Sequence, residues 1–246
     1  MKEQDTSRRH FLAGAAALSG LALAAGLVSS PAVAYAKQAA AKKKMLDSYI
    51  PQFFTIPEWR FLLAACDRLI PSDETGPGAL EAGVPVFIDR QMLTEYGTGG
   101  LWYMHGPFYE DSAPEFGYQM KFSPREIYRV GIAEVMTFSN TKHGKDFHEL
   151  GPDVQDSILK SLESGDSNLD VMPPKIFFAQ LLSNTREGYL ADPMYGGNRG
   201  MGGWKMVGFP GARGDYHEFV RQHNKPYPNA PVSIRRRPEE GRVEHG

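Results

Sequence analysis

The chain has 246 residues, 41% of them hydrophobic, and a formal net charge of −2 at pH 7. This balance of charge argues against a nucleic-acid-binding protein, which would carry a strongly basic surface. A single cysteine excludes an intrachain disulfide, a cysteine-ligated iron–sulfur cluster and haem attachment through a Cys-x-x-Cys-His motif.

Residues 1–34 have the layout of a cleaved bacterial export signal. The pair Arg8-Arg9 precedes a long apolar run that opens with Phe11-Leu12, and small residues suited to cleavage follow the run. The paired arginines resemble a twin-arginine signal, whose pathway generally carries folded proteins. Two alternatives remain open: a general secretory signal with a chance pair of arginines, and an uncleaved anchor helix. We expect twin-arginine export and leave this segment out of the fold prediction.

The rest of the chain divides by composition into three parts. Removing residues 1–34 takes away three basic and two acidic residues and leaves a formal charge of −3. Residues 35–52 are polar and basic and predict a flexible arm. Residues 53–224 carry the amphipathic patterns of one helical domain, and residues 225–246 are proline-rich and charged, which predicts an extended tail. No second apolar run is long enough to span a membrane.

Apolar residues recur at helical spacing in five stretches, and no stretch of useful length alternates as a β-strand would. Thr55 with Glu58, and Ser123 with Glu126, each form a capping box that marks a helix start. The fold class predicted is therefore all-α, a single irregular helical domain with long loops. The predicted helices cover residues 55–70, 82–97, 123–141, 151–165 and 173–190. In the third predicted helix, residues 123–141, the residues at helical spacing are Ile127, Val130, Ala133, Glu134 and Phe138.

Few residues suggest chemistry. Cys66 lies in the first helical pattern, either as a small core residue or as half of a disulfide to another subunit. His105, in an aromatic loop over residues 97–122, is interpreted as a buried loop histidine unless it lines a pocket. His143 and His148 are five residues apart, which does not suit a helical metal pair. No Gly-x-Ser-x-Gly nucleophile motif occurs.

The densest glycine cluster runs from Tyr195 to Ala212. It lacks the third glycine of a Gly-x-Gly-x-x-Gly motif and follows a helix instead of a strand, so it does not predict a dinucleotide site. Glycines mixed with aromatic residues and methionine suit either a loop folded on its own core or a surface that docks on another protein. The candidate interface residues in and beside this cluster are Asp192, Pro193, Tyr195, Asn198, Trp204 and Phe209.

Three segments resemble the family of gluconate 2-dehydrogenase subunit 3, the small subunit of membrane-bound FAD-dependent sugar and polyol dehydrogenases. They are the twin-arginine leader, the stretch RFLLAACDRLIPSDETGPGALEAGVPVFIDRQM, and GYLADPMYGGNRGMGGWKMVGFPGA. The last two enclose residues 60–212, most of the mature chain. The last is the most specific, because its Asp-Pro-Met-Tyr-Gly-Gly-Asn loop has no generic explanation.

The resemblance implies a non-catalytic partner with no catalytic, cofactor or metal site of its own. The chain would carry the export signal of the complex and help the large subunit to mature and cross the membrane. FAD would be bound by a large subunit of the glucose–methanol–choline type, and haem c by a multihaem cytochrome where a third subunit is present. The complex would lie in the periplasm, at the outer face of the cytoplasmic membrane, which this chain would reach only through its partners.

A rival hypothesis is a free-standing exported enzyme or small-molecule-binding protein. It would use a pocket near His105 and Tyr195, with Asp192, Asn198 and Arg199 around it. It predicts a deep cavity in the isolated chain and a polar group of perturbed pKa.

Overall fold

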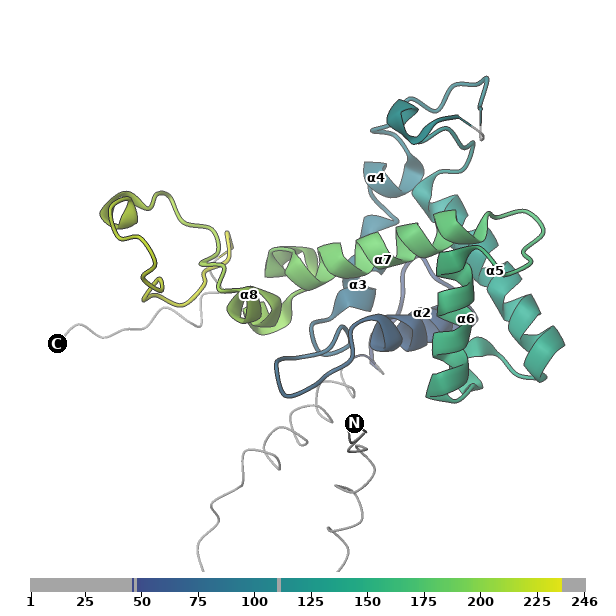
Figure 1. Cartoon of the computed structure of the whole chain (residues 1–246), viewed down its shortest axis with the longest axis horizontal. Coiled ribbons are helices and arrows are strands. Elements are labelled where there is room, and N and C mark those ends of the chain that lie inside the picture. The colour runs from purple at the N-terminus through teal and green to yellow at the C-terminus, as the bar shows by residue number, and fades with distance from the viewer. Residues whose placement is uncertain (1–45, 47, 110–111, 236–246) are drawn as a thin grey trace, which may run out of the picture. The chain divides into compact units, whose positions relative to one another are not determined.

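A computed structural model describes residue 46 and residues 48–109 and 112–235 (Figure 1). The chain divides into two units, Met1–Gln38 and Ala39–Gly246, and every described residue belongs to the second. The predicted export signal therefore lies outside the described residues, as does the end of the predicted tail.

The described part of the chain is helical and contains no β-strand, which confirms the all-α prediction. Its helices are α2 (Ile56–Leu69), α3 (Val84–Gln91), α4 (Glu95–Thr98), α5 (Pro124–His143), α6 (Pro152–Ser164), α7 (Pro174–Leu190) and α8 (Gly202–Val207), with five short 3₁₀ turns between or after them.

Both predicted capping boxes are present. The Thr55 hydroxyl donates to the Glu58 carboxylate at 2.7 Å, and the Ser123 hydroxyl donates to Glu126 at 2.6 Å. In each case the backbone N–H of the capping residue donates to the same carboxylate. These local bonds satisfy donors that the first turn of a helix leaves free, so α2 and α5 begin where the sequence predicts.

The single helix predicted over residues 82–97 is wrong, because the chain breaks between α3 and α4. The Thr94 backbone is extended, and its hydroxyl donates to the Gln91 carbonyl at 2.7 Å. Gly97 then lies against the Met92 carbonyl, where a Cβ atom would clash. A hydrogen-bonding threonine and a close backbone contact together outweigh the helical spacing of the apolar side chains.

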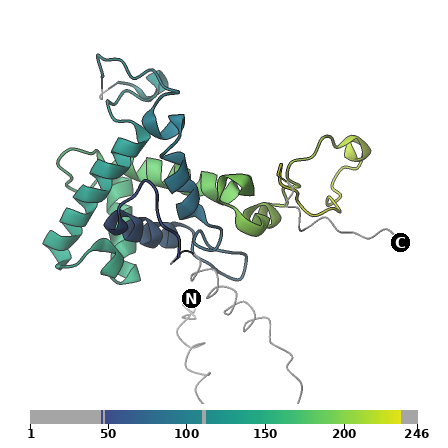
Figure 2. The ribbon, with the colours of Figure 1, turned by 180° about the vertical axis from the view of Figure 1, so that it is seen from behind.

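Helix α7 contacts α3, α5 and α6, and the two views of the ribbon show it running through the helical body (Figures 1 and 2). Phe177 is fully buried, with its ring centre 6.0 Å from that of Phe61. At Gly131 a Cβ atom would clash with the Phe177 ring, so α5 and α7 approach closely only because residue 131 has no side chain.

The buried face of α5 differs from the spacing read in the sequence. Ala133 is exposed, whereas Tyr128, Ile132 and Val135 are fully buried. Glu134 is half-buried because its carboxylate accepts the backbone N–H groups of residues 171 and 172, at 2.7 and 2.9 Å. Those contacts come from the loop before α7, which the local pattern could not show.

A buried carboxylate holds the start of the described chain on the helical body. Asp89 on α3 is fully buried and accepts hydrogen bonds from the Tyr49 hydroxyl at 2.8 Å and from the backbone N–H groups of Gln52, Phe53 and Phe54 at 2.8, 3.0 and 3.1 Å. Burial, followed by this bond to Asp89, raises the pKa of Tyr49 to about 12. Residues 49–52 fall within the flexible segment predicted over residues 35–52. Because Asp89 binds Tyr49 and Gln52, the helical body begins several residues before the predicted start at residue 53.

Candidate partner interface

The glycine-rich stretch folds tightly on the C-terminal end of α7. We call residues 191–211 the collar; it contains the 3₁₀ turns Pro193–Tyr195 and Arg199–Met201 and the helix α8. A Cβ atom at Gly197 would clash with the Gly188 carbonyl, and one at Gly203 would clash with the Tyr189 carbonyl. The collar backbone therefore touches the α7 backbone at two points where only glycine fits.

Two of the six candidate interface residues hold the collar together from inside. Asn198 is fully buried with a φ of 44°; its side chain donates to the Ala191 carbonyl and accepts the Gly203 N–H, both at 2.9 Å. Trp204 is also buried, and its indole N–H donates to the Leu190 carbonyl at 2.6 Å. These side chains shape the collar and are buried in the described chain.

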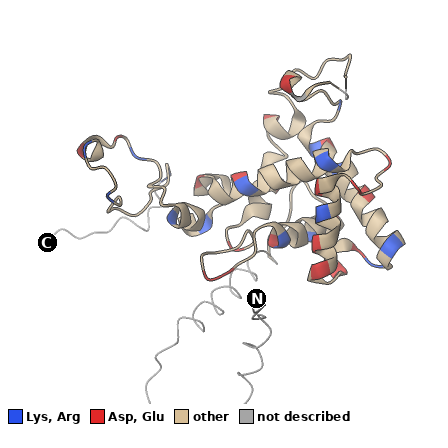
Figure 3. Ribbon diagram, viewed as in Figure 1, with Lys and Arg blue, Asp and Glu red and all other residues tan. Residues whose placement is uncertain are grey.

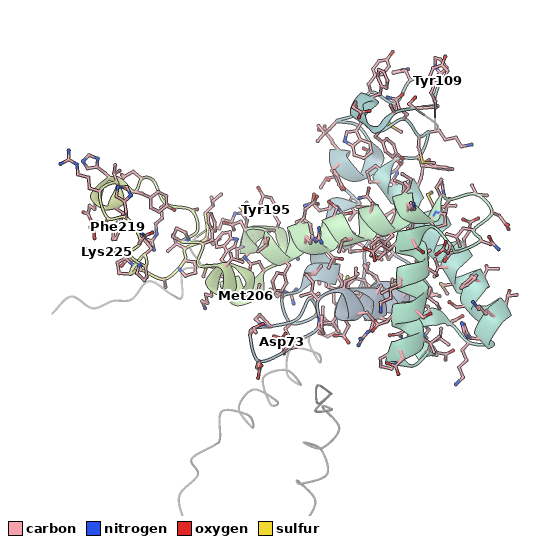
Figure 4. All side chains as sticks on the ribbon, in the orientation of Figure 1. Asp73, Tyr109, Tyr195, Met206, Phe219 and Lys225 are labelled. Carbon is pink, nitrogen blue, oxygen red and sulfur yellow. The ribbon has the colours of Figure 1, made fainter. Side chains whose placement is uncertain are left out.

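Other apolar side chains of the collar face solvent. Tyr195 is 47% exposed and Phe209 is 46% exposed, and Met206 and Val207 are exposed to a similar degree. Figure 4 labels Tyr195 and Met206, both near the end of α7. The ring of Phe209 packs edge-on against Trp204, with 5.1 Å between the centroids, so the buried tryptophan supports an exposed neighbour. A concentration of large exposed apolar side chains is typical of a protein-binding surface.

Asp192 is a structural carboxylate. It is 9% exposed, and its oxygens accept the Ser233 hydroxyl at 2.6 Å, the Ile234 N–H at 2.8 Å and the Met194 N–H at 3.0 Å. Burial alone would raise its pKa, but these three hydrogen bonds outweigh burial and lower the pKa below the usual carboxyl value. A general base at neutral pH needs a pKa near 7, so this perturbation has the wrong direction for that role.

An open pocket of about 630 Å³ lies between α3, α7 and the start of the collar. Asp192 and Tyr195 line it, but the other three residues of the rival enzyme hypothesis, His105, Asn198 and Arg199, do not. Its remaining lining residues are Phe87, Gln91, Arg186, Glu187, Leu190 and Ala191. The sequence did not predict the part that α3 contributes, because Phe87 and Gln91 are about a hundred residues from the collar and only the fold brings them together.

The histidines that the structure describes do not gather into a metal site. His105 is exposed, with its ring centre 5.3 Å from that of Tyr103, so the interpretation as a buried loop histidine is wrong. The loop between α4 and α5, which contains His105, projects from the helices that could have buried it (Figure 1). Within the described ranges no three His, Cys, Asp or Glu side chains are grouped to hold a metal ion.

Cys66 lies in the core. It is fully buried, and its sulfur is 3.8 Å from the Thr185 hydroxyl oxygen. Burial raises the pKa of the thiol to about 12, so the reactive thiolate is scarce at neutral pH. The structure thus favours the core interpretation, since a disulfide to another subunit would require this part of α2 to open.

Comparison with known proteins identifies the family. Residues 56–211, from the first residue of α2 to the end of the collar, match the family described as gluconate 2-dehydrogenase subunit 3. No curated protein and no solved structure matches the chain. None of the helices in the described part of the chain is long and apolar enough to cross a membrane. Because the match covers well over half of the chain, the protein belongs to the gluconate 2-dehydrogenase subunit 3 family.

Proposed function

We propose that this chain is the non-catalytic small subunit of an exported, FAD-dependent dehydrogenase complex of the gluconate 2-dehydrogenase type. Family membership supports a subunit role. The observation that carries the proposal is the collar, where buried Asn198 and Trp204 and close-packed glycines present Tyr195, Met206 and Phe209 to solvent. Two polar groups that a catalyst could use there, those of Asp192 and Asn198, are instead engaged in holding the fold.

The collar is the proposed contact for a flavoprotein subunit of the glucose–methanol–choline type. Exposed aromatic and methionine side chains supply large apolar area, and the tight backbone beneath them lowers the entropy lost on binding. FAD, and haem c where a cytochrome subunit is present, would belong to partners. The pocket beside Tyr195 would receive a side chain of the flavoprotein at the edge of this contact.

The export signal explains why such a subunit is needed. A flavoprotein folds around its cofactor before it leaves the cytoplasm, and a folded protein requires a pathway that accepts one. A twin-arginine leader on a bound partner would carry both chains to the periplasm. The small subunit would then serve as escort and as a maturation factor, and the complex would lie at the outer face of the cytoplasmic membrane.

Affinity purification of the tagged chain from its own cells tests the contact. We expect a flavoprotein with the absorbance of bound FAD to co-purify. Val207→Asp should reduce its yield about tenfold, the effect of roughly 1.4 kcal/mol of lost binding free energy. Val171→Asp is the matched control, because Val171 and Val207 are each 57% exposed and Val171 lies outside the collar, before α7. Absence of a flavoprotein from the unmodified sample, or equal losses with both variants, would contradict the proposal.

The escort role has a separate test. Replacing Arg8 and Arg9 together with lysine should leave the flavoprotein subunit in the cytoplasm while the two chains still bind each other. Cell fractionation followed by immunoblotting of both chains measures this. Arrival of the flavoprotein in the periplasm at its usual level would show that this chain is not its escort.

A further inference from the structure

Beyond the collar the chain forms a closed projection that we call the arm, residues 212–231. Its two ends meet where the Ala212 N–H donates to the Val232 carbonyl at 2.8 Å and the Val232 N–H donates to the Pro210 carbonyl at 3.3 Å. Gly211, with a φ of 79°, faces Val232 so closely that a Cβ atom would clash. The arm therefore leaves and rejoins the helical body at one point.

The arm has internal contacts but no buried residue. The ring centre of Tyr227 is 4.9 Å from that of Phe219 and 5.7 Å from that of Tyr216, and the Arg213 guanidinium lies over the Tyr227 ring at 5.4 Å. All twenty residues from 212 to 231 are exposed or half-buried, and Val220 is 67% exposed. Both ribbon views show the arm standing off the helices (Figures 1 and 2), and Figure 4 labels Phe219 and Lys225 on it. A segment with so little burial gains little stabilising free energy from packing on the helices of its own chain.

Asp192 fastens the arm to the collar. Two of its hydrogen bonds join the start of the collar to Ser233 and Ile234, just beyond the arm, and the third holds Met194 within the collar. We call this set of bonds the latch. Because a buried, ionised acceptor makes strong hydrogen bonds, the latch fixes the base of the arm beside the exposed collar residues.

The charge of the arm differs from that of the whole chain. Residues 212–231 contain three basic residues (Arg213, Arg221 and Lys225) and two acidic ones (Asp215 and Glu218), a net charge of +1, and Arg235 just beyond the arm adds one more positive charge, whereas the chain carries −2. Figure 3 shows the charged positions along the ribbon. Two copies paired so that their arms met would bring like net charges together, which is unfavourable. The charge therefore fits a partner with an acidic surface.

We infer that the arm is a second docking element, held in place by the Asp192 latch, that lies on an acidic surface of the flavoprotein subunit. The identity of that subunit rests on the proposed function. The collar supplies apolar contact, while the arm extends the interface and adds electrostatic attraction. Complex stability should therefore fall as salt screens the charges of the arm.

Photocrosslinking in the intact complex tests this inference. Benzoylphenylalanine placed at Val220 should crosslink to an Asp- and Glu-rich peptide of the flavoprotein, whereas the same group at Val171 should not. A crosslink from Met206 without one from Val220 would overturn the arm proposal and leave the proposed function standing. Absence of both crosslinks would overturn both. Crosslinking of Val220 to another copy of this chain, or binding of the chain to phosphatidylglycerol vesicles through the arm, would also overturn the arm proposal.

Variants of the latch provide a second test. Asp192→Asn keeps one acceptor oxygen but loses the oxygen that accepts the Ile234 N–H, and Ser233→Ala removes a single bond. Each should lower the crosslink yield from Val220 by about threefold or more, in line with roughly 1 kcal/mol per lost bond. Ser233→Ala, which lies outside the pocket, should in addition leave the yield from Met206 unchanged. Ser164→Ala, which removes an exposed bond to Asp166 at the end of α6, is the control. Unchanged Val220 yields in both latch variants would overturn the role of the latch.

Discussion

Replacing Asp89 with alanine should detach the segment that precedes α2. The change removes the acceptor of four hydrogen bonds, and the Phe54 N–H among them is fully buried. A buried donor without a partner costs about 1–3 kcal/mol, and the three half-buried donors recover part of their loss from water. We expect the free energy of unfolding to fall by about 3 kcal/mol, which corresponds to roughly 6–12 °C in melting temperature for a domain of this size.

Thermal unfolding followed by circular dichroism measures this loss, and hydrogen exchange at residues 52–54 locates it. Asp89→Asn keeps one acceptor oxygen and should cost about 1 kcal/mol. Glu163→Ala, at an exposed carboxylate on α6, is the control and should change little. An Asp89→Ala protein that melts with the unmodified chain, and whose residues 52–54 exchange no faster, would refute the reasoning.

Three further predictions concern the collar, the latch and the core. Gly203→Ala should cost about 1–3 kcal/mol of stability, because the new methyl group clashes with the Tyr189 carbonyl; chemical denaturation measures it, and no loss would show that the collar can shift. The folded pKa of Asp192 lies below the usual carboxyl value, so the latch contributes fully above about pH 4 and is lost as pH falls through the folded pKa. Hydrogen exchange of the Ile234 N–H should accelerate over that range, and a pH-independent ratio to the unfolded rate would contradict this. Cys66 should resist iodoacetamide at pH 8 until the chain unfolds, as mass spectrometry can show; fast native labelling would contradict its burial.

Local sequence rules worked where the decisive interactions span a few residues. The starts of α2 and α5 follow from a hydroxyl and a carboxylate three residues apart, and the structure contains both bonds. The same rules failed at residues 82–97, where Gly97 packs against the Met92 carbonyl. They also misjudged His105, because burial depends on which distant elements cover a loop.

The candidate interface was found from composition but not resolved by it. A cluster of glycine, aromatic and methionine residues indicated a special surface, yet it could not show that Trp204 and Asn198 face inward while Tyr195 and Phe209 face solvent. Asp192 was selected as an interface residue, and the fold instead pairs it with Ser233, about forty residues further along the chain.

The sequence by itself determined the helical class, two helix starts, the family and the position of the glycine-rich cluster proposed as an interface, because each depends on residue spacing or on a motif of adjacent residues. Only the tertiary structure decided that Asp89 binds the segment before α2, that the collar packs on α7 and that Asp192 fastens the arm. Those contacts join groups far apart in the chain. Their partners are selected by backbone geometry and burial, which no local pattern of side chains specifies.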